Sequence, residues 1–183
     1  MNAQLFQGEL VCLAALNPET DAEAIARWSR DSEYWRLAFP TPARPRLTKR
    51  VKEELEKTSD ATEFAIRALA DDRFIGVIGL YGIRWTHREA WVGIHIGERA
   101  YWGRGYGTDA MRVILRYAFT ELNLYRISLN VLADNTRARR SYEKAGFVIE
   151  GSVRRASQYD GRGWDEAYMG LLRDEWERVT SDK

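Results

Sequence analysis

Tyr101-Trp102-Gly103-Arg104-Gly105-Tyr106-Gly107-Thr108-Asp109-Ala110 places three glycines at every second position between two regular patterns. Before it, Trp91–Gly97 alternates Val and Ile as a strand does, and after it Met111–Leu122 carries apolar residues at helical spacing. Glycine permits φ > 0 and close approach of a ligand, and a helix N-terminus offers unpaired N–H groups. The stretch therefore predicts a loop whose main-chain amides cradle a phosphate, with a simple chain-reversing turn as the alternative.

Two known phosphate motifs can be compared with this loop. A Walker loop requires Lys-Ser or Lys-Thr after its last glycine, and neither follows here. Gly105-x-Gly107-x-x-Ala110 fits a dinucleotide fingerprint, and Asp134 follows at roughly the 20-residue distance of a ribose-binding acid. That fingerprint should follow its strand closely, whereas residues 98–104 intervene. A dinucleotide-dependent oxidoreductase is therefore a weaker alternative.

A second motif lies downstream, where residues 135–147 read N-x-x-A-x-x-x-Y-x-K-x-G-F. Together with the glycine loop, it resembles the GNAT family of acetyl-CoA-dependent N-acetyltransferases, most closely the branch of ribosomal-protein N-terminal acetyltransferases. The family loop runs Gln/Arg-x-x-Gly-x-Gly/Ala. Gly105 and Gly107 fit it, but Trp102 stands where Gln or Arg is usual. The resemblance extends from about Arg88 to Trp176.

The resemblance implies a set of residues that bind acetyl-CoA. The loop amides would wrap the pyrophosphate, and the main chain of the preceding strand would pair with the pantetheine arm. Asn135 would bind the pantetheine region, and a nearby arginine, Arg140 among them, would meet the 3′-phosphate. Apart from those two, the implied residues are His95, Ile96, Gly97, Gly103, Arg104, Gly105, Tyr106, Gly107 and Thr108. For His95 we also consider a base that titrates near neutral pH, and favour a half-buried structural histidine.

Tyr142 is the expected catalytic acid. It lies seven residues after Asn135, so on a helix the two share a face roughly 10 Å apart. The resemblance implies that Tyr142 donates its proton to the departing CoA sulfur, and a phenol pKa near 10 keeps that proton in place. The alternatives are an N-cap role for Asn135 and ordinary helix–sheet packing for Tyr142. Arg137, Arg139 and Arg140 otherwise indicate a solvated basic face.

The general base is less clear from the sequence. Many relatives place a Glu on the strand before the loop, at a position that Trp91 occupies here. Glu89 lies two residues earlier on the same face, and we expect it to act directly or through water. A free α-amine has a pKa near 8 and needs less help than a lysine or polyamine amine near 10.4. We therefore favour a protein N-terminal α-amine as acceptor, attacking directly in a ternary complex, over a small-molecule amine. A non-catalytic CoA-binding module is the alternative from another class.

Composition restricts the remaining possibilities. The 183 residues, 45% of them hydrophobic, suit one domain over residues 1–183. Lys plus Arg total 28 against 27 acids, a net charge of +1 that favours neither nucleic acid nor membrane as a partner. One cysteine, Cys12, favours a reducing compartment and a buried structural thiol. We expect a cytoplasmic monomer or homodimer without signal peptide, metal or membrane span.

The order of elements predicts an α+β (mixed α/β) fold with helices on both faces of a mixed sheet. The resemblance to the GNAT family implies that this central sheet is mostly antiparallel, with six or seven strands and a splayed strand pair at the cofactor site. An aromatic, irregular, proline-rich segment over residues 34–46 is expected as a lid over the acceptor. The expected strands are Leu10–Leu16, Glu63–Ala70, Phe74–Leu80, Trp91–Gly97, Arg126–Leu132, Phe147–Ser157 and Glu166–Leu172; the expected helices are Asp21–Arg30 with Asp21 as N-cap, Thr48–Thr58, Met111–Leu122, Asn135–Gly146 and Asp174–Val179.

Overall fold

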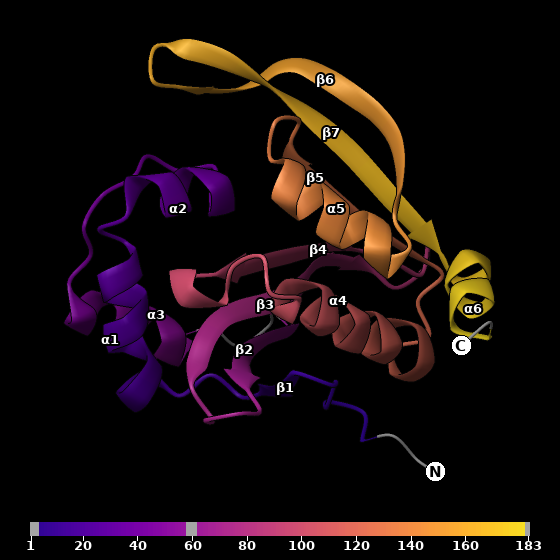
Figure 1. Cartoon of the computed structure of the whole chain (residues 1–183), viewed down its shortest axis with the longest axis horizontal. Helices are drawn as coiled ribbons and strands as arrows, with labels where there is room; N and C mark the ends of the chain where they lie inside the picture. The colour runs from indigo at the N-terminus through magenta and orange to yellow at the C-terminus, as the bar shows by residue number, and fades with distance from the viewer. Residues whose placement is uncertain (1–3, 58–61, 182–183) are drawn as a thin grey trace.

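One seven-stranded sheet runs through the molecule in the order β1-β2-β3-β4-β5-β7-β6 (Figure 1). The computed structural model describes residues 4–57 and 62–181. Neighbouring strands are antiparallel except β4 and β5, which are parallel, so the predicted mixed, mostly antiparallel sheet is confirmed. The strands are β1 Val11–Ala14, β2 Thr62–Ala68, β3 Phe74–Arg84, β4 Glu89–Ile96, β5 Arg126–Leu132, β6 Val148–Tyr159 and β7 Arg162–Leu172.

The sheet opens between its two parallel strands. β4 and β5 pair over three residues only, from Glu89↔Arg126 to Trp91↔Ser128. Beyond that point β4 continues along β3 as far as Ile96, while β5 continues along β7. The expected splayed strand pair is therefore present, and beyond Trp91 no strand of the described residues pairs with the second edge of β4.

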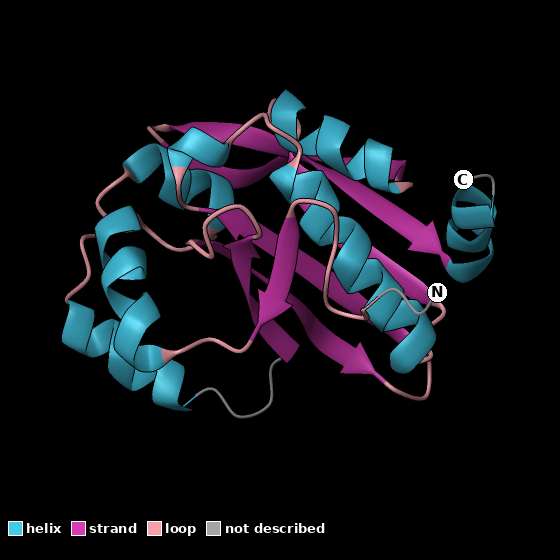
Figure 2. Ribbon diagram, turned by 60° about the horizontal axis from the view of Figure 1, so that its bottom comes forward, coloured by secondary structure: helices cyan, strands magenta, loops and turns pink. Residues whose placement is uncertain are grey.

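Helices cover both faces of the sheet (Figure 2). Alternate residues of a strand point to opposite faces. On β2 and β3, Ala65 and Val77 pack with the first three helices, whereas Ile66 and Ile78 pack in the larger core under α4. Buried Met111, Ile114 and Leu115 of α4 fill that second core. The helices are α1 Pro18–Trp28, α2 Ser32–Ala38, α3 Thr48–Lys57, α4 Tyr106–Arg116, α5 Thr136–Ala145 and α6 Arg173–Ser181.

The first helix begins earlier than predicted. Asn17 is its N-cap, and the side chain of Asn17 accepts a hydrogen bond of 2.9 Å from the amide of Glu19. Pro18 follows at the first helical position, where its missing N–H costs nothing. The prediction of Asp21 as N-cap was wrong. Asp21 is 1% exposed and pairs with Arg67 on β2 at 2.9 Å.

The aromatic segment around Tyr34 was wrongly predicted to be irregular throughout. Its first part forms α2, with Asp31 as N-cap accepting a 3.1 Å hydrogen bond from the amide of Tyr34. Tyr34 and Trp35 are both buried although they are adjacent in the chain. Apolar residues three or four positions apart, which predict a helix, are therefore not apparent in this segment. The chain leaves the helix before Pro40, as expected for a residue that lacks an N–H.

Other boundaries differ by a few residues. α4 starts at Tyr106 rather than Met111 and passes at Arg116 into a π-helical segment, Tyr117–Glu121. The hairpin turn at Asp160-Gly161 is confirmed by positive φ at both residues, and β7 starts directly after it. Thr58, the expected end of the third helix, lies outside the described residues. Cys12 is half-buried on β1. No helix in the described ranges is long and apolar enough to cross a bilayer.

Candidate active site

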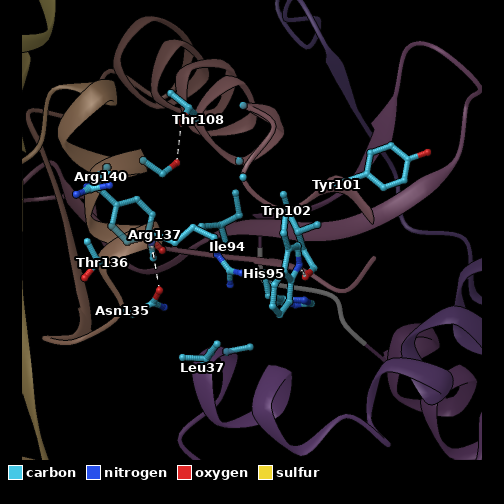
Figure 3. A pocket seen from close by; sticks show the side chains of 18 of the residues that line it. Leu37, Ile94, His95, Tyr101, Trp102, Thr108, Asn135, Thr136, Arg137 and Arg140 are labelled. Atoms are coloured by element: carbon cyan, nitrogen blue, oxygen red, sulfur yellow. Dashed lines mark hydrogen bonds between the residues drawn. The ribbon is translucent and has the colours of Figure 1, made fainter. Parts of the chain in front are cut away.

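A cavity of about 430 Å³ lies at the opening beside β4. Its walls come from the end of β4, the glycine loop, α5 and one side of α2 (Figure 3). Volumes of this size are typical of small-molecule sites. The residues that line it are Tyr34, Leu37, Ala38, Ile94, His95, Ile96, Tyr101, Trp102, Gly103, Gly105, Gly107, Thr108, Asn135, Thr136, Arg137, Ala138, Arg140, Ser141, Tyr142 and Lys144.

The glycine loop presents free main-chain donors to this cavity. Gly103 and Gly105 have φ of 69° and 92°, and Gly105 is the N-cap of α4. In the part of the chain that the structure describes, the amides of residues 103–108 have no acceptor, whereas the amide of Asp109 already bonds to Gly105. Six consecutive amides at a helix N-terminus are suited to an anion such as a diphosphate.

Asp109 fixes the start of α4 in place. Its carboxylate is 6% exposed and accepts hydrogen bonds from the amides of Glu9, Leu10 and Val11 at 3.2, 2.8 and 3.0 Å. Gly8 allows this contact, because a Cβ there would lie 2.3 Å from Asp109 Oδ2. The N-terminal segment therefore supports the glycine loop from behind.

The other loop side chains play different parts. Thr108 Oγ1 lies 2.8 Å from Ser141 Oγ, which joins α4 to α5 beside the cavity. Arg104 donates to the carbonyl of Ala100 at 3.1 Å, and Tyr106 is buried against Tyr101. Arg104 and Tyr106, which the sequence predicted to bind the cofactor, do not line the cavity.

The open edge of β4 offers further main-chain groups. The amide of Gly97 donates to the carbonyl of Ile75 on the β3 side at 2.9 Å. Because main-chain groups alternate in direction along a strand, those of Ile96 and Ile94 point away from β3 into the opening. Gly97 itself is needed for packing, since a Cβ there would lie 1.9 Å from the Trp28 ring. Of the three strand residues expected to bind pantetheine, Ile96 directs its amide toward the cavity, and this amide has no acceptor among residues 4–57 and 62–181.

Trp102 closes the wall between the glycine loop and α5. Its indole Nε1–H donates to the carbonyl of Ile96 at 2.7 Å. The guanidinium carbons of Arg137 and Arg99 lie 3.7 and 4.6 Å from the ring centroid, and Arg99 also pairs with Asp31 before α2. The aromatic residue at this unusual position thus connects α2, the loop and α5.

His95 lies half-buried among aromatic rings. Its Nδ1 is 2.7 Å from the hydroxyl of Tyr34, and its ring centroid is 4.9 Å from that of Phe39. Burial lowers the pKa of His95 to about 4. The imidazole is therefore uncharged at neutral pH, which supports the interpretation as a structural histidine over a titrating base.

α5 carries both expected ligand residues on the cavity side. Asn135 is its N-cap and accepts a 3.2 Å hydrogen bond from the amide of Ala138. Tyr142 lines the cavity, and its ring centroid lies 6.2 Å from that of Phe147. Its hydroxyl has no hydrogen-bond partner among the described residues. Burial raises the pKa of Tyr142 to about 12. The phenol is thus a protonated, free donor at neutral pH.

The charges around the cavity have one sign. Its charged lining residues are Arg137, Arg140 and Lys144, and no carboxylate among the described residues lines it. A cavity lined by three cations and by the glycine loop, whose amides have no acceptor among the described residues, fits a ligand with several phosphates, as CoA has.

A comparison with known families agrees with this geometry. The family description "Acetyltransferase (GNAT) domain" matches residues 11–148. The chain belongs to the GNAT acetyltransferase family. It is therefore an N-acetyltransferase that uses acetyl-CoA, and the dinucleotide-dependent oxidoreductase and the non-catalytic module are not supported.

The names of individual relatives differ in whether they state an acceptor and in which one they state. The GNAT chain is 36% identical over 130 residues to "Probable N-acetyltransferase YjcK" of Bacillus subtilis, covering 70% of each protein. It is 34% identical over 109 residues to "Putative ribosomal N-acetyltransferase YdaF" of the same organism, covering 60% of this chain and 59% of that protein.

A third relative bears a polyamine in its name. The chain is 34% identical over 107 residues to "Spermidine N(1)-acetyltransferase" of Vibrio cholerae, covering 58% of this chain and 61% of that protein. A solved structure of spermidine N-acetyltransferase from Vibrio cholerae with CoA and spermine has the same fold, with a TM-score of 0.80 at 24% identity over 92% of this chain and 98% of that one.

The expected base of this GNAT enzyme lies away from the cavity. Glu89 is at the start of β4, where the strand still pairs with β5, and six residues along β4 separate it from His95 by roughly 20 Å. Its carboxylate accepts a 2.6 Å hydrogen bond from Arg84. Glu89 does not line the cavity, and its role as base stays a prediction.

A second groove of about 430 Å³ adjoins this cavity. The two share Leu37, Asn135, Thr136 and Arg137. α2 lies beside the tip of the β6–β7 hairpin (Figure 1), and the groove is lined by residues of both. Arg36 on α2 pairs with Asp160 at the tip at 2.8 Å. Its remaining lining residues are Glu33, Asp134, Tyr159, Arg162 and Trp164. The sequence did not indicate this hairpin wall, because its residues carry no motif.

Proposed function

We propose that the enzyme transfers the acetyl group of acetyl-CoA to the α-amine of a protein or peptide N-terminus. The acceptor would enter through the second groove and meet the thioester where the groove and the cavity share residues, beside Asn135 and Arg137. A small-molecule amine is the competing acceptor, and the relatives bear names of both kinds.

The charge of the cavity carries this proposal. No carboxylate of the described residues lines it, and the single histidine that does has a pKa of about 4. An acceptor must therefore arrive largely neutral. An α-amine with a pKa near 8 does so in part at neutral pH, whereas an amine near 10.4 is almost entirely charged.

The proposed steps use few protein groups. The lone pair of the amine attacks the thioester carbon, and the amide of Ile96 stabilises the oxyanion that forms. The carbon–sulfur bond then breaks while the Tyr142 hydroxyl donates a hydrogen bond to the sulfur. The nitrogen loses one proton and the sulfur gains one, so the products are an N-acetyl amide and CoA thiol.

An acceptor panel tests the proposal. Purified enzyme with acetyl-CoA is offered a peptide with a free N-terminus, the same peptide with a blocked N-terminus and a free lysine, and spermidine. Acetylation at the free N-terminus, located by mass spectrometry, is the expected result. Modification of the lysine or of spermidine, with the N-terminus untouched, contradicts it.

A further inference from the structure

The second groove holds charges of both signs, but they are not equally available. Glu33 pairs with Arg99 at 2.7 Å, and Asp160 pairs with Arg36 at 2.8 Å. These two ion pairs use two of the three acids that line the groove. Asp134 is the remaining carboxylate, and its side chain makes no ion pair within the described residues.

Two guanidinium groups in the groove have no carboxylate partner among the described residues. Arg162 lies with its guanidinium carbon 4.0 Å from the centroid of the Trp164 ring, and Arg137 lies 3.7 Å from that of Trp102. Trp164 is itself fixed, because its Nε1–H donates to the carbonyl of Tyr159 at 3.1 Å and its ring stacks on Tyr159 at 4.8 Å. A guanidinium that lies over a ring need not use its N–H donors there, so they can still bind a carboxylate bidentately.

We infer that the enzyme selects acceptors that carry a carboxylate close to the amine, bound by Arg162 and Arg137. This rests on the proposed function and deepens it: the preferred peptide has Asp or Glu at its second or third residue. The amine enters the shared part of groove and cavity, and the following residues lie along the groove toward the hairpin. A polyamine, with several positive charges, meets two free guanidinium groups and one free carboxylate there, so the same feature disfavours it.

The test compares matched peptides with an amidated C-terminus. One set has Asp or Glu at position two or three, and the other has Asn or Gln there. A third peptide is a neutral dipeptide with a free C-terminal carboxylate. It shows whether a terminal carboxylate is recognised as well as a side-chain carboxylate. We expect kcat/KM to be roughly three- to tenfold higher for the acidic peptides, a range typical of one partly exposed charge-assisted hydrogen bond.

Arg162→Gln should reduce the ratio of kcat/KM for acidic over neutral peptides to within about twofold of one, since the variant loses the charged donor that distinguishes the two sets. Arg154→Gln, on the same hairpin but outside the groove, is the matched control and should retain the preference. Arg162→Glu should invert the preference toward Lys at the same position. Because Arg137 also lines the cavity, Arg137→Gln is measured against both substrates, and a larger rise in KM for the acidic peptide supports its place here.

Equal rates for acidic and neutral peptides, or a preference that survives Arg162→Gln and Arg162→Glu, overturns the inference alone. The proposed N-terminal acetylation would still stand in that case. If no peptide N-terminus is acetylated while spermidine is, the proposed function fails, and the inference fails with it.

Discussion

The hydroxyl of Tyr142 and the sulfur that it would serve differ in acidity. Burial raises the pKa of the phenol to about 12, whereas a free thiol titrates near 8.5. Full proton transfer from one to the other is unfavourable by roughly 5 kcal/mol. We therefore expect Tyr142 to stabilise the leaving sulfur mainly as a hydrogen-bond donor, with the proton moving only as the bond breaks.

Tyr142→Phe tests this role. The variant keeps the ring that packs near Phe147 but removes the donor, so we expect kcat to fall by about 10²-fold with KM for acetyl-CoA within about threefold. Steady-state kinetics with acetyl-CoA varied at saturating peptide give both constants. An unchanged kcat would assign Tyr142 to packing, the alternative considered from the sequence.

His95 should make stability depend on pH. Its pKa falls from 6.5 to about 4 on folding, so the unfolded chain binds the proton more tightly between those values. Stability is then complete above pH 6.5 and is lost as pH falls toward 4, by on the order of 3 kcal/mol in total. We expect His95→Gln to reduce the fall of the free energy of unfolding between pH 6.5 and 4, as measured by urea unfolding at pH 7.5, 6 and 5. Parallel curves for the two proteins would contradict a neutral buried imidazole.

At the scale of elements, the turn into α4 depends on one backbone conformation. Gly105 has φ of 92°, and a Cβ there would lie 3.3 Å from Leu10 Cδ1. We expect Gly105→Ala to cost about 1–2 kcal/mol in free energy of unfolding and to raise KM for acetyl-CoA several-fold, because the free amides shift.

Gly151→Ala is the control for that change. Gly151 lies on β6, its φ is not positive, and a Cβ there meets nothing within 4 Å. Melting temperature and KM are measured for both variants. Equal behaviour of the two would show that the loop does not depend on the left-handed conformation of Gly105.

The elements also show what the sequence could and could not predict. Strand alternation predicted most of the strands and the Asn135–Phe147 motif predicted α5, because each is a local pattern. The splayed strand pair was implied by the resemblance to the GNAT family, and the phosphate role of the glycine loop stays a prediction. α2 was missed, since its buried Tyr34 and Trp35 are neighbours. The second groove was missed for another reason: Glu33 and Trp164 are far apart in the chain, and only the folded sheet brings α2 to the hairpin.

The role of Asp109 was likewise hidden. In the sequence it is one acid in the first turn of a helix, which the helix dipole already explains. Its three amide partners lie near residue 10, about 100 positions away. Contacts of this kind follow from the tertiary fold and leave no local signal.

At the scale of the whole molecule, cofactor binding should stabilise the fold. A ligand at 100 times its Kd adds about 2.7 kcal/mol, which for a chain of this size raises the melting temperature by roughly 5–10 °C. We expect CoA and acetyl-CoA to give such a rise and NAD to give none, as measured by differential scanning fluorimetry. A shift with NAD and none with CoA would contradict the assignment of the cavity.

The Arg99–Trp102–Arg137 stack has a kinetic consequence. Trp102 connects the glycine loop to α5 through Arg137 and toward α2 through Arg99, and Arg137 belongs to both the cavity and the groove. Filling the cavity therefore fixes a side chain that the incoming peptide must also contact, so the two substrates should add in a compulsory order, acetyl-CoA first. Product inhibition by CoA that is competitive with acetyl-CoA and noncompetitive with peptide, together with inhibition by acetylated peptide that is noncompetitive with both substrates, would reveal this order. If the Trp102→Leu variant no longer gave this inhibition pattern, the compulsory order would depend on the indole ring of Trp102.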